Sequence, residues 1–297
     1  MINDSAEAVT RDALQVMAAT PDPRLRDIMT ALVRHLHTFV SEVRLTEDEF
    51  REATAYLNTI GQLTNDKHNE FVLMAGSLGV SSLVCLLNNG DNGATETSQN
   101  LLGPFWRMNS PLTENGASIL RSQTPGTAML VSFRFVDPSG APIVGAEVDI
   151  WHTSPDGLYE NQDESQADMN MRGKFISDGD GKVYFRTVKP AGYPIPTDGV
   201  VGKLLAAQQR HAYRPAHIHA LAFKQGYKTL ITQIYADDDP RVHTDVQFGV
   251  TKALLGRFEK HDGQHPKHAD IAAPWYSLDH TLVMEPGVAK LPRPPIK

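Results

Sequence analysis

The clearest structural pattern in the sequence is RPAHIHALAFKQGYKTLITQIYADDDP at residues 214–240. Two apolar runs, HIHALAFK and TLITQIYAD, lie on either side of the turn residues KQG. Short apolar runs separated by Gly, Lys and Gln or Asp residues are typical of strands joined by turns. Because side chains alternate along a strand, we expect His217 and His219 to project from one face.

The same pattern recurs over the second two thirds of the chain. Further short runs are AMLVSFRFVD, GAEVDIWHT and KVYFRTV, and the turn signals between them are DPSGAP, SPDG and DGDG. This spacing predicts an all-β sandwich or barrel. We therefore expect residues 101–297 to form a β-sandwich domain. Its last thirty-odd residues end in the Pro-rich VAKLPRPPIK and are expected to wrap the surface.

Residues 1–100 are predicted to be a helical N-terminal domain. Asp22 and Pro23 have the character of an N-cap followed by proline in the first helical turn. Apolar residues then recur at three- and four-residue spacing, which predicts an amphipathic helix over 25–43. These positions are Leu25, Ile28, Met29, Leu32, Val33, Leu36, Phe39, Val40 and Val43.

Two more helices are expected in this domain. One begins at Thr46, where Glu49 three residues on would complete a capping box. The other covers about residues 68–88 and ends in the Gly- and Asn-rich sequence NNGDNGATETSQN at 88–100. The broad apolar stripe of helix 25–43 suits a contact between subunits, but covering the sandwich core would explain it equally well.

Composition excludes several classes of function. The chain has 297 residues, 41% apolar and 21% charged, with a formal net charge of −7. The negative charge argues against a nucleic-acid partner, and no apolar stretch is long enough for a membrane span. Cys85 is the only cysteine, so no internal disulfide is possible, and a buried position in SSLVCLL is expected. We expect a cytoplasmic protein, because the start of the sequence lacks signal-peptide character.

Two tyrosines accompany the histidine pair. Tyr159 lies in GLYENQD and Tyr193 in KPAGYPIPTDG. Zinc sites favour Cys, His and carboxylates, whereas phenolate is a hard anionic ligand suited to ferric iron. Taken singly, each tyrosine is compatible with ordinary packing, and His-x-His with a solvated strand face.

The flanking sequence resembles a known family. The resemblance runs from LLGPFWR at 101–107 to DVQFGV at 245–250, through VDIWHTSPDGLYENQD, RGKFISDGDGKVYFRTVKPAGYPIPTDG, RPAHIHALAF and TLITQIYADDDP. These stretches are similar to the intradiol ring-cleavage dioxygenases, most of all to hydroxyquinol 1,2-dioxygenases, with catechol 1,2-dioxygenases close behind. The implied fold is a helical dimerisation region followed by a β-sandwich that carries iron.

The resemblance implies a site and a reaction. It places the Fe³⁺ ligands at Tyr159, Tyr193, His217 and His219. Two phenolates and a hydroxide would balance the charge of one ferric ion, which favours burial. Tyr193 would also accept a proton from an aromatic diol, and O₂ would cleave the bond between the hydroxylated carbons. Arg214 would stabilise negative charge and Gln233 would be a further polar catalytic residue; a surface ion pair and a strand face are the alternatives for them.

The resemblance also implies a substrate pocket and a quaternary structure. Besides Arg214, the lining would be Leu73, Gly76, Leu101, Pro104, Phe105 and Val246. Related hydroxyquinol enzymes carry an acidic residue near Gly76, so its absence here leaves room and makes a chlorinated hydroxyquinol a candidate. The family association further implies a homodimer through the N-terminal helices, with a phospholipid in that interface.

Two other classes of function stay open from the residues alone. One is a β-sandwich module that binds an aromatic or a carbohydrate without catalysis. The other is a non-haem Fe(II) oxygenase, in which His217 and His219 would be joined by Asp237, Asp238 or Asp239. Six other histidines are expected to be surface or packing residues: His35, His37, His152, His261, His265 and His268.

Overall fold

The chain divides into two compact units, Met1–Thr59 and Ile60–Lys297. The computed structural model describes residues 4–65, 69–88 and 97–294. The first unit is helical and the second contains both sheets. This agrees with the expected order of a helical region followed by a β-sandwich.

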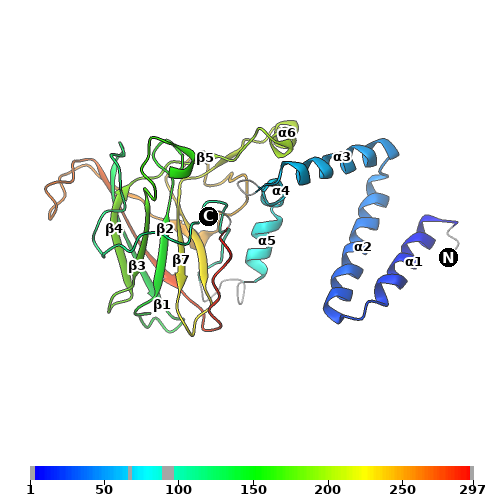
Figure 1. Ribbon diagram of the computed structural model, residues 1–297, viewed down its shortest axis with the longest axis horizontal. Helices are drawn as coiled ribbons and strands as arrows, with labels where there is room; N and C mark the ends of the chain where they lie inside the picture. The colour runs from blue at the N-terminus through cyan, green and yellow to red at the C-terminus, as the bar shows by residue number, and fades with distance from the viewer. Residues whose placement is uncertain (1–3, 66–68, 89–96, 295–297) are drawn as a thin grey trace. The chain divides into compact units, whose positions relative to one another are not determined.

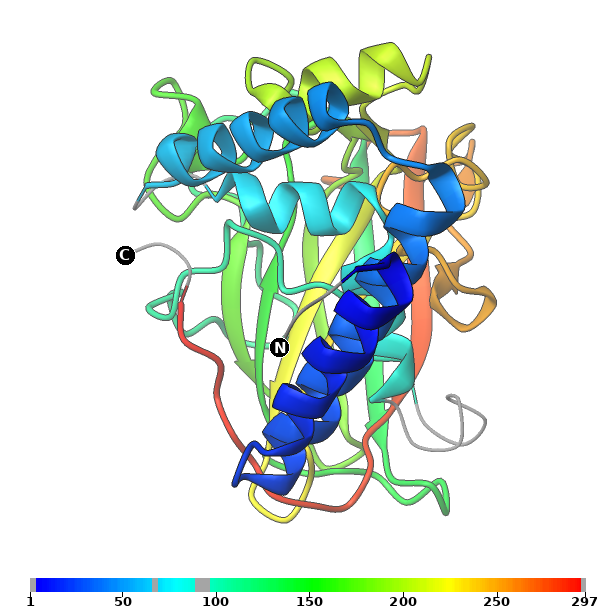
Figure 2. The ribbon, with the colours of Figure 1, turned by 90° about the vertical axis from the view of Figure 1, so that its right-hand side faces the viewer.

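The helical unit contains α1 (Ala6–Ala18), α2 (Pro23–Val43) and the start of α3 (Glu47–Leu63). Figures 1 and 2 show α1 lying alongside α2. The predicted N-cap is confirmed, because Asp22 Oδ1 accepts a hydrogen bond from the backbone N–H of Leu25 at 2.6 Å. The predicted capping box is also confirmed: Glu49 accepts from the backbone of Thr46 at 2.9 Å, and Thr46 Oγ1 accepts from that of Glu49 at 3.3 Å.

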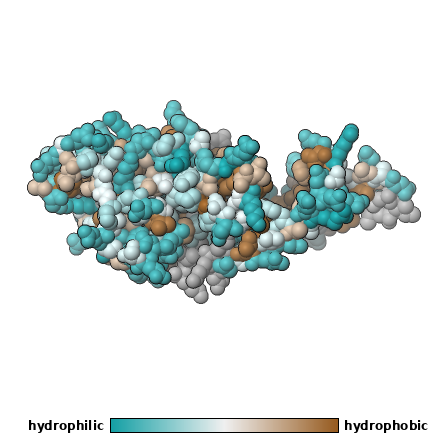
Figure 3. All heavy atoms as spheres, turned by 90° about the horizontal axis from the view of Figure 1, so that it is seen from above, coloured by the Kyte–Doolittle hydropathy of each residue, from teal (hydrophilic) through white to brown (hydrophobic). Residues whose placement is uncertain are grey.

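The apolar stripe of α2 remains accessible in the isolated chain. Hydrophobic side chains reach the surface of the helical unit in Figure 3. Seven residues of the stripe are 43–52% exposed: Leu25, Ile28, Leu32, Leu36, Phe39, Val40 and Val43. An apolar face of this size is a common sign of an association surface.

The third predicted helix is in fact two. Its described part forms α4 (Glu70–Ser77) and α5 (Val80–Leu87), which are bent by 75° relative to each other. The break lies at Gly79, whose φ of 74° is costly for residues with a side chain. Cys85 on α5 is only partly buried, so the expectation of full burial was wrong. No single helix of the described chain is long and apolar enough to span a membrane; only α4 and α5 together pass that test, by length and composition alone.

Two sheets form the sandwich (Figure 1). The five-stranded sheet has the order β3 (Arg172–Ile176), β2 (Glu147–Trp151), β7 (His217–Phe223), β8 (Leu230–Ala236), β9 (Leu255–Gly256). The four-stranded sheet has the order β10 (Glu259–His261), β11 (Trp275–Val283), β1 (Ala128–Val136), β4 (Lys182–Val188). Alternate side chains from both sheets form one apolar core, which includes Val131, Phe133, Phe185, Ile218 and Ile234.

The end of the chain corrects one expectation. Residues 275–283 do not wrap the surface but form β11, which pairs in parallel with β1. Their alternation in WYSLDHTLV places Leu278 and Leu282 in the core. Smaller elements complete the fold: β5 (Tyr193–Pro194), β6 (Tyr213–Arg214), α6 (Val200–Ala207), and the 3₁₀ turns η2 (Glu160–Gln162) and η3 (Lys252–Leu254).

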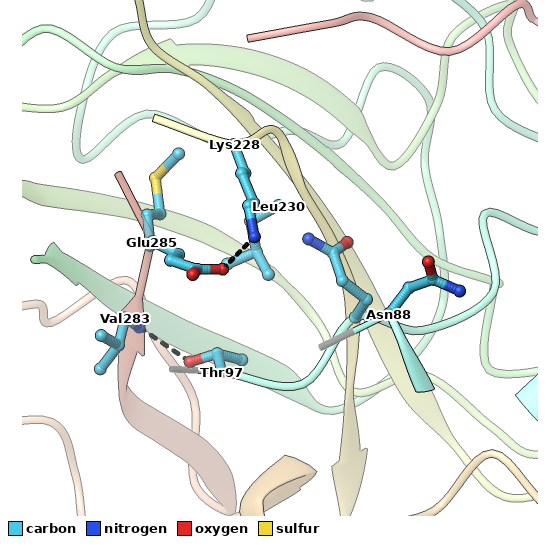
Figure 4. Close-up of a pocket in the computed structure, with 8 residues that line it drawn as sticks. Asn88, Thr97, Lys228, Leu230, Val283 and Glu285 are labelled. Carbon is cyan, nitrogen blue, oxygen red and sulfur yellow. Dashed lines mark hydrogen bonds and ion pairs between the residues drawn. The ribbon is translucent and has the colours of Figure 1, made fainter. Parts of the chain in front are cut away.

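Polar contacts hold the segments that flank the sandwich. Thr97 Oγ1 accepts a hydrogen bond from Val283 N at 2.8 Å, and Lys228 forms an ion pair with Glu285 (Figure 4). The hollow beside these residues has a volume of only about 20 Å³. It has room for about one water molecule and is too small for a substrate.

Candidate metal centre

The two histidines lie on the outer face of the five-stranded sheet. His217 and His219 are alternate residues of β7, and Ile218 between them points into the core. Both histidines are almost fully buried, at 2% and 1% exposure. The expected common face is therefore confirmed, and it is a covered face rather than a solvated one.

Loops bring the two tyrosines to this face. Tyr159 follows the SPDG turn and immediately precedes η2, while Tyr193 begins β5 and pairs with Arg214 on β6. Gly157 has a φ of 80°, and a Cβ there would lie 3.1 Å from Cβ of Tyr193. A glycine is thus required both by the turn and by the close approach of the second tyrosine.

The four side chains form one compact cluster. The hydroxyl of Tyr159 lies 3.1 Å from Nε2 of His219. Ring centroids are 5.7 Å apart for Tyr159 and Tyr193, 5.5 Å for Tyr193 and His217, and 4.8 Å for His217 and His219. All four predicted ligands are therefore brought together by the fold.

Their protonation states suit a hard cation. Burial lowers the pKa of His217 to about 3, with help from the charge of Arg214, and burial also lowers the pKa of His219 well below its usual value. Both imidazoles are thus neutral and have a lone pair to donate. Burial, with Tyr193 nearby, raises the pKa of Tyr159 well above its usual value. A phenolate at Tyr159 therefore requires a cation beside it.

One imidazole nitrogen is available for a ligand bond. Nδ1 of His217 lies 2.7 Å from the carbonyl oxygen of Pro215, so it donates and leaves Nε2 unprotonated. That Nε2 is buried and has no hydrogen-bond partner among the described residues. A buried, unpaired acceptor costs free energy unless something coordinates it, so the side chains present fit a metal ion of hard, ferric character.

Neighbouring groups fix the orientation of His219. The indole of Trp151 stacks on its ring at a centroid distance of 4.5 Å and an angle of 10°. On another side, Gly103 has a φ of 74°, and a Cβ there would lie 3.3 Å from Cε1 of His219. The imidazole is therefore held between an aromatic plane and the backbone of LLGPFWR.

Tyr159 is supported by a buried ion pair. Glu160 accepts a hydrogen bond from Nε of Arg172 at 2.6 Å, with both side chains almost inaccessible, and from Arg107 at 3.0 Å. Arg172 also donates to the carbonyl oxygen of Phe105 at 2.6 Å, and the Phe105 ring lies 4.4 Å from that of Tyr159. These contacts hold Glu160, which follows Tyr159 in the chain, and Phe105, whose ring lies beside the phenol.

Arg214 and Gln233 belong to a buried polar chain. Arg214 is paired with Asp245, at 3.2 Å from each carboxylate oxygen, and its Nη2 donates to the hydroxyl of Tyr235 at 2.6 Å. That hydroxyl donates to Gln233, which in turn donates to the carbonyl oxygen of Leu101 at 2.6 Å. Asp245 keeps the pKa of Arg214 well above its usual value despite the opposing effect of burial. The alternative of a surface ion pair for Arg214 is therefore wrong.

The predicted pocket residues divide into three groups. Leu73 and Val246 pack together in one apolar cluster with Ile195. Phe105 and Leu101 contact the candidate centre through the ring of Tyr159 and the amide of Gln233. Pro104 is exposed, and the structure does not bring it into these contacts.

One expectation about Gly76 is corrected. A Cβ at Gly76 would lie 3.0 Å from Nε2 and 3.1 Å from Cδ of Gln247. The missing side chain therefore does not leave open room, because the side chain of Gln247 fills it. The amide of Gln247 also puts a polar group at this place.

The Fe(II) alternative has no structural support. Within residues 4–65, 69–88 and 97–294, no group of three His, Cys, Asp or Glu side chains is placed to hold a metal. Asp237 accepts from Phe258 N, Asp239 accepts from Ala216 N, and Asp238 is paired with Lys189. His152 is buried, as expected of a packing residue, with its ring nitrogens 2.7 Å from Thr153 O and Thr187 Oγ1.

Several residues of the site escaped the sequence argument. The sequence patterns place Tyr235 and Trp151 on strands without a further role, but the register pairs them with His217 and His219. The patterns likewise give no role to Asp245 in DVQFGV. Charge pairing is the signal that could have found Asp245. An arginine that is buried beside an apolar strand requires a carboxylate partner.

Fold and cluster define a class: a β-sandwich protein with a buried tyrosine–histidine centre suited to a hard metal ion. The family model described as "Dioxygenase" matches residues 101–276, and that described as "Catechol dioxygenase N terminus" matches residues 22–95. A hydroxyquinol 1,2-dioxygenase of Rhizobium sp. (strain MTP-10005) is 40% identical over 267 residues, which cover 89% of this chain and 90% of that protein.

Two other relatives agree. A 6-chlorohydroxyquinol 1,2-dioxygenase of Cupriavidus pinatubonensis is 37% identical over 280 residues, which cover 94% of this chain and 96% of that protein. The crystal structure of a hydroxyquinol 1,2-dioxygenase from Pseudomonas putida DLL-E4 superposes with a TM-score of 0.87 at 37% identity, covering 95% of this chain and 99% of that one. The chain belongs to the intradiol ring-cleavage dioxygenases, a family of oxidoreductases.

Proposed function

We propose that the protein cleaves a hydroxyquinol-type 1,2-dihydroxybenzene between its two hydroxylated carbons and inserts both atoms of O₂. With hydroxyquinol itself the product is maleylacetate. The observation that carries this proposal is the buried cluster of Tyr159, Tyr193, His217 and His219. Relatives named as hydroxyquinol 1,2-dioxygenases support the choice of substrate.

We assign these four side chains as the ligands of one Fe³⁺ per subunit. When bound, the ion would supply Lewis-acid chemistry that lowers the pKa values of the diol hydroxyls. Metal analysis and the visible spectrum of the purified protein test this. About one iron per chain with a red-brown colour supports the assignment, whereas a colourless, iron-free active protein contradicts it.

The protein side chains have distinct parts in the reaction. Tyr193 is the proposed proton acceptor, at its phenolic oxygen, for one hydroxyl of the substrate. Arg214 provides a fixed positive charge in a buried place, where charge acts more strongly than in water. Its partners Asp245 and Tyr235 hold the guanidinium in one orientation, and Gln233 extends that support to the backbone at Leu101.

Substrate binding is assigned to the apolar side chains beside this cluster. Leu73, Val246 and Phe105 would contact the ring, and Leu101 would complete the wall. Next to Gly76, the amide of Gln247 is a candidate partner for a third ring hydroxyl, because it lies where a side chain at residue 76 would be.

Oxygen uptake with hydroxyquinol and with catechol, corrected for autoxidation, tests the substrate. Rapid uptake with hydroxyquinol and little with catechol supports the proposal. The reverse result would make the protein a catechol 1,2-dioxygenase, and 6-chlorohydroxyquinol is the second candidate because of the Cupriavidus relative. A coloured, iron-loaded protein that consumes O₂ with none of these diols would keep the metal assignment and direct the search to other substituted diols. A colourless, iron-free protein that consumes no O₂ would favour the binding-module alternative.

We further propose a homodimer formed through residues 1–100, with residues 101–297 as the catalytic domain. The half-exposed stripe on α2 supports a subunit contact. Light scattering behind size-exclusion chromatography tests it, since a mass near 65 kDa is about twice the chain mass of 32.7 kDa. Organic extraction and mass spectrometry of the same sample test for a phospholipid in that interface, and a lipid-free monomer would contradict both proposals.

A further inference from the structure

A second hollow lies on the outer face of the four-stranded sheet. Its volume is about 460 Å³, within the range of about 300–1,000 Å³ that is common for small-molecule sites. Its floor is a row of paired positions across β4, β1 and β11, namely Arg186, Leu130 and Ser277. Its wall is the loop between β10 and β11, together with His261 and Trp275 at the two ends of that loop.

This hollow is separate from the candidate metal centre. The centre lies on the outer face of the other sheet, and the apolar core of the sandwich lies between the two faces. None of the four proposed iron ligands is among the residues that line the hollow. Packed sheets are about 10 Å apart, so a ligand in one place cannot touch the other.

Aromatic rings line the wall in fixed positions, and 7% of Trp275 is exposed there. Trp275 is held by a hydrogen bond from Nε1 to the carbonyl oxygen of Gly263 at 3.0 Å. His261 stacks on its ring at 3.9 Å, and His265 lies 4.5 Å away. His265 in turn stacks on His268 at 4.6 Å. A flat ring is the ligand shape that such planes favour.

The floor supplies a cation at the edge of these rings. Arg186 donates from Nη1 to Asp270 at 2.7 Å, while its Nη2 lies 3.0 Å from Nδ1 of His268. The Asp270 side chain is 68% exposed and that of Arg186 is 33% exposed. A pair this open is weak, so a carboxylate that reaches the hollow can replace Asp270 on the guanidinium, which binds carboxylates in a planar fork.

A metal ion is a poorer fit. Across the described parts of the chain, no three His, Cys, Asp or Glu side chains are placed to hold one. His261 is also occupied, since its Nε2 lies 2.8 Å from the hydroxyl of Ser277. The imidazoles here therefore act as flat faces and hydrogen-bonding groups.

We propose that this hollow, which we call the Trp275 pocket, binds a small planar aromatic carboxylate. The ring lies among Trp275, His265 and His268, and the carboxylate bonds to Arg186 in place of Asp270. Nothing in this inference depends on the substrate of the metal centre.

Calorimetric titration of the iron-loaded protein with benzoate tests the proposal. Arg186→Gln should weaken binding at one site by about tenfold or more, because it removes a charge-assisted hydrogen bond. Asp270→Asn should tighten binding at the same site, because the internal competitor loses its charge. The matched control is Arg134→Gln. Arg134 is on the same face of β1 as Leu130, but it does not line the pocket.

Two further measurements separate this site from benzoate bound at the metal centre. Quenching of the Trp275 fluorescence, taken as the difference between the wild type and Trp275→Phe, should follow the Arg186-dependent site. Cyclohexanecarboxylate, which is not flat, and benzamide, which is not charged, should each bind there at least about tenfold more weakly. If Arg186→Gln, shown to be folded by circular dichroism, binds benzoate with unchanged stoichiometry and affinity, the proposal is wrong.

Discussion

Two glycines allow the ring side chains of the centre to meet. Gly157 and Gly103 have φ values of 80° and 74°, and each lies beside a proposed ligand. Because a Cβ would meet Tyr193 at 3.1 Å and His219 at 3.3 Å, any other residue would push a ring outward. The centre is therefore set by missing side chains as well as by the rings themselves.

Replacing Tyr159 with Phe removes a proposed ligand and keeps the packing of the ring. We expect the visible charge-transfer band to shift and weaken, because only the Tyr193 phenolate would remain. Turnover should fall by at least about 100-fold, since even residues that only support metal ligands change activity by 10- to 100-fold. Absorption spectroscopy and oxygen uptake measure the two effects. Tyr227→Phe is the matched control, and a Tyr159→Phe protein that keeps both colour and turnover would refute the ligand assignment.

Replacing Arg214 with Ala tests its proposed role. Iron and colour should stay while turnover falls by about 100-fold or more. The free energy of unfolding should also fall by about 3 kcal/mol, because Asp245 is left buried without its partner. Adding Asp245→Asn should recover part of the stability but none of the turnover. An unchanged kcat in the single variant would exclude a charge-stabilising role.

Two features of the secondary structure position the site: the alternation of side chains along β7 and the break between helices α4 and α5. In β7 the period of two assigns His217 and His219 to one face and Ile218 to the other. In the helical segment the break at Gly79 turns α5 away from α4, which leaves Leu73 packed against Val246. Ser82 on α5 donates a hydrogen bond to the carbonyl oxygen of Gln247 at 2.6 Å. Both helices therefore contact the loop at 245–250.

Replacing Gly79 with Ala tests this break. The φ of 74° is strained for alanine, and a Cβ would meet Phe248 at 3.2 Å. We expect a loss of about 1–2 kcal/mol in the free energy of unfolding, measured by urea denaturation. Because Leu73 and Gln247 would shift, the KM for the diol should rise while the iron content stays the same. Gly263→Ala, where a Cβ has open space, is the control.

The whole sandwich determines which histidines are neutral. His152 is 1% exposed, and burial, aided by the charge of Arg172, lowers its pKa from 6.5 to about 4. Between pH 6.5 and about 4, His152 binds a proton in the unfolded chain but not in the folded protein. Stability from this group is therefore complete above pH 6.5 and declines as the pH falls toward 4, by up to about 3 kcal/mol.

Replacing His152 with Gln should flatten that decline. The free energy of unfolding would be measured by urea denaturation at several pH values between 4 and 7. The exposed His243→Gln should keep the dependence of the wild type. An equal slope in His152→Gln and the wild type would show that other groups, such as the buried His217 and His219, account for the acid sensitivity.

Local patterns were enough for some features. The N-cap at Asp22, the capping box at Thr46 and Glu49, and the common face of the two β7 histidines depend on neighbours within a few residues, and the structure confirms all three. The break at Gly79 could not be predicted in the same way. A glycine inside an apolar run is compatible with a continuous helix. Only contacts with distant residues, such as the hydrogen bond from Ser82 to the carbonyl oxygen of Gln247, select the bend.

The amino-acid sequence by itself determined the helical and β regions, because periodicity is a property of neighbouring residues. Its motifs also carried the resemblance that implied the family and the candidate ligands. Tertiary structure alone decided the partners of Arg214, the occupation of the space beside Gly76 by Gln247, and the parallel pairing of β11 with β1. It also created the Trp275 pocket, whose floor and wall come from strands far apart in the chain. Burial and close approach are collective, so they exist only once distant segments have packed.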